Sequence, residues 1–178
     1  TDIYATSINY KVDAELTQKF FATVQNKMHY AVHGYTAAEI IARRANSKKP
    51  LMGLTGFKSD YITASDIVIA KNYLTEPEIN QLNLIVSLYI DFAELQAANG
   101  RLMKMQDWVR KLDEFLTISE KNLLQSAGKV TAKQAEKKAS EEYIKYRSMK
   151  DKSYISDFDR EVKKLLIDKK RTKKLKSD

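Results

Sequence analysis

The sequence has 178 residues, enough for one domain with a sizeable core, and its charged fraction of 30% is that of a globular protein. Only 5 glycines and 2 prolines are present, too few for the many turns of an all-β fold. The absence of cysteine excludes disulfides, thiolate metal sites and cysteine nucleophiles. No apolar run reaches the length of a membrane span, so we expect no membrane contact.

Positive charge is concentrated at the C-terminal end. Residues 163–178 hold eight lysines and arginines against two aspartates, and so contribute +6 to the net charge of +8. We therefore divide the chain into a helical domain over 1–162 and a basic tail over 163–178. A tail of this kind is either simply solvated or makes nonspecific contacts with nucleic acid phosphates. The predicted contacts are Lys169, Lys170, Arg171, Lys173 and Lys174.

Helical patterns begin near the N-terminus. Apolar residues from Leu16 to Val32 follow helical spacing, and Gly34 is placed to end that helix. The next four residues after Tyr35, from Thr36 to Glu39, form a capping box, which predicts a short second helix to about Asn46. We expect an irregular loop over 47–65 and a helix from Asp66 through Leu74.

The region from 79 to 98 is the most apolar helical pattern in the chain. Thr75 and Glu78 form a second capping box, and apolar residues cover most of the helix circumference. We therefore expect a central, buried helix. One polar stripe interrupts it, and this stripe is either the solvent face or one wall of a polar cleft facing the histidine-bearing helix. Its residues are Asn80, Asn83, Ser87, Asp91 and Glu94.

The C-terminal third continues in helices. Met105 to Leu116 is amphipathic, and Thr131 with Gln134 forms a third capping box. A narrow seam of alanines and tyrosines follows, and apolar spacing continues through Leu166. The segment over 131–166 either packs inside the monomer or mediates self-association or partner binding. The fold predicted is all-α: a compact bundle around the 79–98 helix, with one irregular loop and a long C-terminal helical segment.

Two histidines lie four residues apart, close to several charged side chains. His29 and His33 share one helix face, a spacing with which two histidines can hold zinc. The zinc-protease pattern also needs glutamate directly after the first histidine, where this chain has Tyr30. We therefore assign no metal, and leave open a structural role or a catalytic cluster. The candidate catalytic residues are His29, His33, Glu39, Arg43 and Asp91.

Arg43 and Arg44, together with Lys48 and Lys49, form a small basic patch that is either solvated or binds phosphate. No glycine-rich phosphate loop supports it, because the sequence from Gly53 to Gly56 lacks the lysine and the hydroxyl residue of a P-loop. We find no other cofactor-binding motif, and so expect no cofactor.

Six blocks in this order resemble the C-terminal domain of the RhuM-like virulence-associated protein family of bacteria. The resemblance runs from "TDIYATS" to about Asp159 and rests on "FFATVQNKMHYAVHGYTAAEIIARRA", "KPLMGLTGF", "IAKNYLTEPEINQLNLIVSLYIDFAELQA", "MQDWVRKLDEFL", "GKVTAKQA" and "EYIKYRSMKDKSYISDFD". It implies a bacterial, cytoplasmic protein that normally carries a DNA-binding-like N-terminal segment. The chain opens on Thr1 rather than methionine, in keeping with the C-terminal part of a longer protein. The HPFxxGNxR loop of AMP-transferring domains is absent.

Two functions follow as hypotheses. The first is a non-enzymatic regulatory or interaction module acting beside a DNA-binding-like domain. The second is an enzyme of nucleic acid or nucleotide chemistry, which requires the candidate catalytic residues to meet around one cleft.

Overall fold

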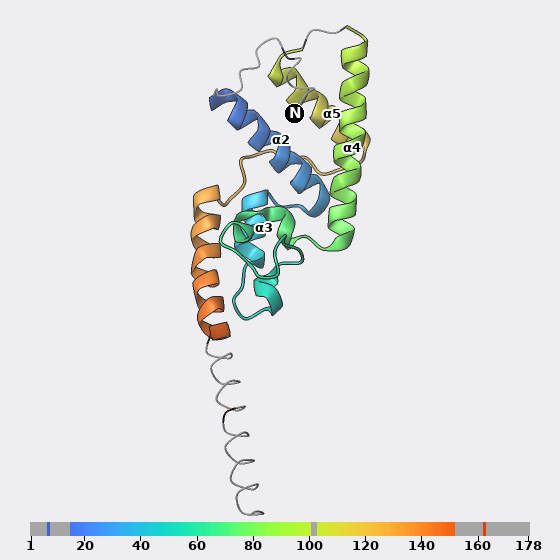
Figure 1. The fold of residues 1–178 in the computed structure, drawn as a ribbon. Helices are drawn as coiled ribbons and strands as arrows, with labels where there is room; N and C mark the ends of the chain where they lie inside the picture. The colour runs from blue at the N-terminus through green and yellow to red at the C-terminus, as the bar shows by residue number, and fades with distance from the viewer. Residues whose placement is uncertain (1–6, 8–14, 101–102, 152–161, 163–178) are drawn as a thin grey trace, which may run out of the picture.

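The computed structural model describes residues 7, 15–100, 103–151 and 162 (Figure 1). Secondary structure within these residues is helical throughout, which confirms the all-α class. The α-helices are α2 (Glu15–His33), α3 (Ala37–Arg44), α4 (Glu76–Ala98), α5 (Met105–Ile118) and a helix over 132–151, called the C-terminal helix below. Three 3-10 turns, η1 (Pro50–Gly53), η2 (Asp66–Val68) and η3 (Ala70–Tyr73), lie between α3 and α4. None of the helices described has both the length and the apolar character needed to cross a membrane.

The elements form two groups joined by α2. At one end α2 packs against α4 and α5, and at the other α3 packs against η3 with the C-terminal helix beside them (Figure 1). Phe20, Val24 and Met28 place the apolar side of α2 in the core, as their spacing predicts. From α5, Trp108 and Leu112 complete the same core with almost no exposed surface.

The corner between α2 and α3 has the predicted geometry. Gly34 adopts a left-handed conformation with φ +76°, and its amide donates to the Tyr30 carbonyl at 2.8 Å. Thr36 and Glu39 form the capping box reciprocally, because each side chain accepts from the other's amide, at 3.3 and 2.8 Å. The chain therefore reverses within a few residues without leaving the ends of the two helices unsatisfied.

The expectation that the 79–98 helix is buried over most of its circumference is wrong. The capping box of Thr75 and Glu78 is present, but α4 buries only one side, through Leu82, Ile85, Tyr89 and Ala93. Tyr89 donates to the Trp108 carbonyl at 2.6 Å, which fixes this side against α5. No described element covers the opposite side, because α2 and α5 both pack on the inner one. High apolar content here does not mean burial all round.

Residues 66–74 form two 3-10 turns instead of the predicted helix. Carbonyls that an α-helix would use are taken by other partners: Asn72 Nδ2 donates to Asp66 O at 3.0 Å, and the Thr55 amide donates to Asn72 O at 2.7 Å. Tyr73 donates its hydroxyl to Ile67 O at 2.8 Å. These hydrogen bonds compete with the i to i+4 hydrogen bonds of an α-helix, so residues 66–74 form 3-10 turns instead.

The C-terminal helix begins at the predicted capping box of Thr131 and Gln134. Of its alanine–tyrosine seam, Ala135 and Ala139 are buried inside the monomer. Glu142 accepts from the Ser47 amide at 2.8 Å, which ties this helix to the loop after α3. These two alanines of the seam therefore pack within the monomer, whereas Ala132, its first alanine, is exposed. The rest of the predicted self-association segment, after residue 151, lies almost wholly outside the described residues, as does the basic tail.

One-sided burial of α4 predicts unequal effects of two neighbouring leucines. Leu82 is 8% exposed and Leu84 is 60% exposed. Leu82→Ala should lower the free energy of unfolding by about 2–4 kcal/mol, because it leaves a cavity between packed helices. Leu84→Ala, the matched control, should change it by about 0.5 kcal/mol or less. Urea denaturation measures both, and equal losses would mean that α4 is covered on both sides.

Candidate functional site

The polar stripe of α4 faces away from the histidines. Asn80, Asn83, Ser87, Asp91 and Glu94 are all exposed. The side of α4 that packs on α2 is the opposite, apolar side. Of the two interpretations of this stripe, the solvent face is correct. Asp91 is therefore separated from the histidine-bearing helix by the body of α4.

His29 and His33 meet each other rather than a substrate cleft. His29 is only 3% exposed, and its Nδ1 lies 3.2 Å from Nε2 of His33. Burial, with a smaller effect from His33, lowers the pKa of His29 to about 4. Burial also lowers the pKa of His33. Two protonated rings would place N–H donors head to head, so the contact requires at least one neutral ring.

Beside His33 lies a bidentate ion pair between α3 and α4. Arg44 donates from both Nη atoms to the two carboxylate oxygens of Glu78, each at 2.6 Å, and also to the Tyr73 carbonyl at 2.7 Å. The hydrogen bonds from Arg44 hold the pKa of Glu78 at about 2. Both side chains are mostly covered by protein. The guanidinium of Arg44 is thus bound within the fold.

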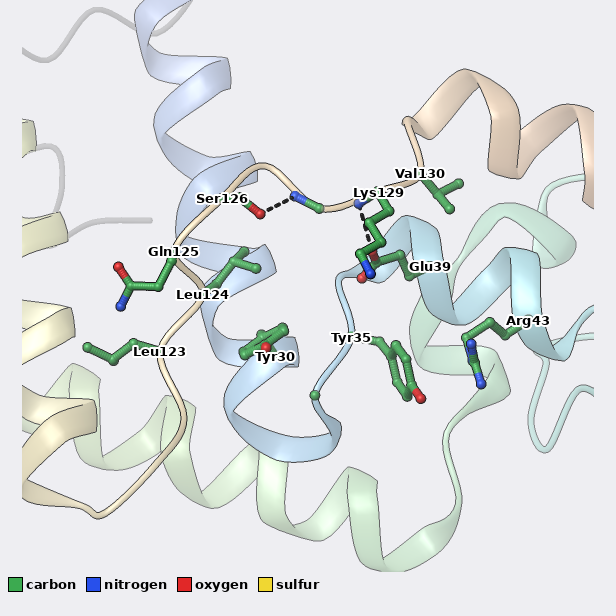
Figure 2. A pocket seen from close by; sticks show the side chains of 12 residues that line it. Tyr30, Tyr35, Glu39, Arg43, Leu123, Leu124, Gln125, Ser126, Lys129 and Val130 are labelled. Carbon is green, nitrogen blue, oxygen red and sulfur yellow. Dashed lines mark hydrogen bonds between the residues drawn. The ribbon is translucent and has the colours of Figure 1, made fainter.

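A surface groove of about 410 Å³ lies on the other side of the α2–α3 corner (Figure 2). Tyr30, Tyr35 and Arg43 line one wall. Residues 123–126 and 128–130, from the segment that connects α5 to the C-terminal helix, line the other. The Arg43 guanidinium lies over the Tyr35 ring, 4.3 Å from its centre. Neither His29, His33 nor Asp91 lines this groove.

Glu39 holds the connecting segment in place. The Lys129 amide donates to its Oε1 at 2.7 Å, while Oε2 accepts from the Thr36 amide. Burial alone would raise the pKa of Glu39, but these amide hydrogen bonds keep it below its ordinary value. A general base works best with a pKa near the operating pH, so Glu39 is tuned away from that role.

Five predicted catalytic residues therefore occupy three separate places. His29 is buried with the half-buried His33 beside it, Glu39 and Arg43 are at the groove, and Asp91 is on the outer face of α4. Across the described residues, no three histidine, aspartate or glutamate side chains gather as metal ligands would. Of the predicted phosphate contacts, Arg43 is at the surface groove and Arg44 is paired. The predicted tail residues lie outside the described part: Lys169, Lys170, Arg171, Lys173 and Lys174.

Sequence reasoning missed three elements of this region. Glu78 was assigned only to its capping box, although it also binds Arg44, 34 positions earlier in the chain. Tyr35 was not noticed as the ring under Arg43. Residues 123–130 carried no pattern that places them against α3. The only sequence signal for the distant partner of Arg44 was its position in the last turn of a short helix, before a long loop.

The histidine pair predicts a pH dependence of stability. The folded chain keeps His29 neutral down to about pH 4, whereas an unfolded chain protonates it near pH 6.5. The unfolded state therefore binds more protons between these values, and the free energy of unfolding should fall by about 3 kcal/mol from this group as pH falls from 6.5 to 4.

Denaturation from pH 7 to pH 4.5 measures this slope, and His29→Gln should flatten it. Histidine ring signals in NMR provide an independent reading, with no titration of His29 above pH 5. Parallel stability curves for the two proteins would show that His29 is not held neutral by the fold.

Comparison with known proteins places the chain in a family. A family model described as the Virulence protein RhuM family matches residues 1–155, most of the chain. No curated protein matches, and no solved structure does. The match agrees with the resemblance carried by the sequence blocks. The chain therefore belongs to the RhuM family of virulence proteins.

Proposed function

We propose that this chain is a non-enzymatic interaction module of a virulence protein, and that it recognises a basic amphipathic segment on the outer face of α4. In the full-length protein it would regulate a DNA-binding-like N-terminal domain. The observation that carries the proposal is the exposure of large apolar side chains on a helix whose other side is fully packed. Leu84, Leu88 and Leu95 are 60%, 47% and 58% exposed.

These three leucines lie on one stripe. Together with Asp91 they follow steps of four, three and four residues, which places them along one side of the helix. An aligned row of exposed leucines is characteristic of interaction sites, whereas single exposed leucines are ordinary. A helix laid along the stripe would bury all three side chains.

Charge indicates which kind of helix fits. α4 contains four acidic residues and no lysine, arginine or histidine. Asp91 and Glu94 lie on or beside the leucine stripe and are exposed. The last turn of α4 also holds no basic residue of its own to offset the negative end of the helix dipole. A partner with apolar residues on one side and lysines or arginines beside them complements all three features.

The enzyme hypothesis has less support. It requires His29, His33, Glu39, Arg43 and Asp91 to converge, and they occupy three places. The histidines contact each other, and each carboxylate oxygen of Glu39 accepts a hydrogen bond from a backbone amide. These contacts are those of structural residues.

Binding of a designed peptide tests the proposal. The probe is a fluorescent peptide with leucine and lysine at helical spacing, and its scrambled version provides the composition control. We expect fluorescence anisotropy to show binding of the helical probe by the full chain. Leu88→Lys should weaken it by roughly tenfold or more, because it removes apolar contact and adds like charge.

Two variants serve as controls. Ile144→Lys replaces an exposed apolar residue of the C-terminal helix, 69% exposed, and should leave binding unchanged. His33→Gln should also leave it unchanged. In the full-length protein, Leu88→Lys should abolish the effect on virulence while His33→Gln retains it. The reverse pattern would favour the enzyme, and probe binding that ignores Leu88 would reject the α4 face.

A further inference from the structure

We propose that the basic amphipathic segment recognised by α4 is residues 155–176 of a second copy of this chain, so that the protein self-associates by exchanging C-terminal segments. This inference rests on the interaction function proposed above and names its partner. It uses the outer face of α4, defined by Leu84, Leu88, Asp91, Glu94 and Leu95.

The apolar residues of the segment match the stripe in spacing. Phe158, Val162 and Leu166 follow one another at steps of four residues. Such residues align on one side when the segment docks as a helix. From Ile155 to Leu166 the separation along the chain equals that from Leu84 to Leu95. The two rows therefore have the same length when laid side by side.

The charges that follow the apolar row of the segment are opposite in sign to those of α4. Residues 163–178 hold eight lysines and arginines, and Lys169 and Lys170 come directly after the apolar row. The outer face of α4 offers Asp91 and Glu94, with no basic residue anywhere in the helix. Opposite charges at the edge of an apolar contact set its orientation and speed its formation. The same lysines on an unrelated acidic surface would lack the aligned leucines.

The position of the C-terminal helix favours a second copy. This helix and α4 lie on opposite sides of α3 and the loops around it (Figure 1). The segment that follows residue 151 thus starts away from the α4 face of its own chain. Between two copies, each segment can reach the other's α4, and the two contacts are equivalent, as a twofold assembly requires.

Charge reversal tests this pairing in the full chain. One variant carries Asp91→Lys and Glu94→Lys on α4, and the other carries Lys169→Glu and Lys170→Glu on the segment. In each variant alone, the side chains at positions 91 and 94 have the same sign of charge as those at positions 169 and 170. Sedimentation velocity at low salt should show concentration-dependent dimers for the wild-type chain and roughly tenfold weaker dimerisation for each variant.

Mixing the two variants is the decisive step. In a dimer of one copy of each variant, each segment meets an α4 of opposite charge. An equimolar mixture should therefore dimerise again with near wild-type affinity. A control with Lys133→Glu and Lys137→Glu, both exposed on the C-terminal helix, makes the same change in net charge and should dimerise normally.

Binding of the designed helical probe separates failure of this inference from failure of the proposed function. A wild-type chain that stays monomeric, or variants whose mixture does not recover, would overturn the exchange between copies. If the designed helical probe still binds at Leu88, the α4 face remains an interaction site with another partner. If the designed probe also fails to bind there, both proposals fall.

Discussion

The fold depends on one charged group that must be paired where it lies. The Arg44 guanidinium is mostly covered by protein, and an uncompensated charge there would cost several kcal/mol. Glu78 neutralises it with two hydrogen bonds, and the Tyr73 carbonyl takes a third contact. Arg44 lies in α3, Tyr73 in η3 and Glu78 in α4. The hydrogen bonds of one guanidinium therefore hold these three elements together. Glu78 has a further task, because it also completes the cap of α4.

That pairing also separates the functions of two adjacent arginines. Successive residues of a helix point about 100° apart, so when Arg44 turns inward, Arg43 is directed to the other side of α3. There it lies over Tyr35 at the surface groove. Among the residues that the structure describes, no carboxylate forms an ion pair with Arg43. Of the two arginines of the predicted basic patch, Arg44 is structural and Arg43 remains available to a ligand.

Local signals predicted the local structure well. The capping boxes at Thr36 and Thr75 and the left-handed Gly34 were all recognisable, because each depends on residues within a few positions of one another. The same reasoning could not find the partner of Arg44. Its distance along the chain is large, and Glu78 already had a sufficient explanation as a capping residue. The turns at 66–74 were missed for a related reason, since their carbonyls are claimed by side chains and by a loop that no periodicity encodes.

The candidate site shows the same limit in a sharper form. The spacing of His29 and His33 correctly placed both rings on one helix face, where they contact each other. It could not say whether that face looks inward, and burial decides their chemistry. For α4 the sequence overestimated burial, because high apolar content was taken to mean that the helix is buried all round. A helix that is apolar all round must be covered all round, whereas the described residues of this chain cover only the inner side of α4. The leucines left outside cost the monomer solubility without stabilising it. Their alignment, beside acidic residues and without a single basic one, is therefore best explained by a partner that covers them.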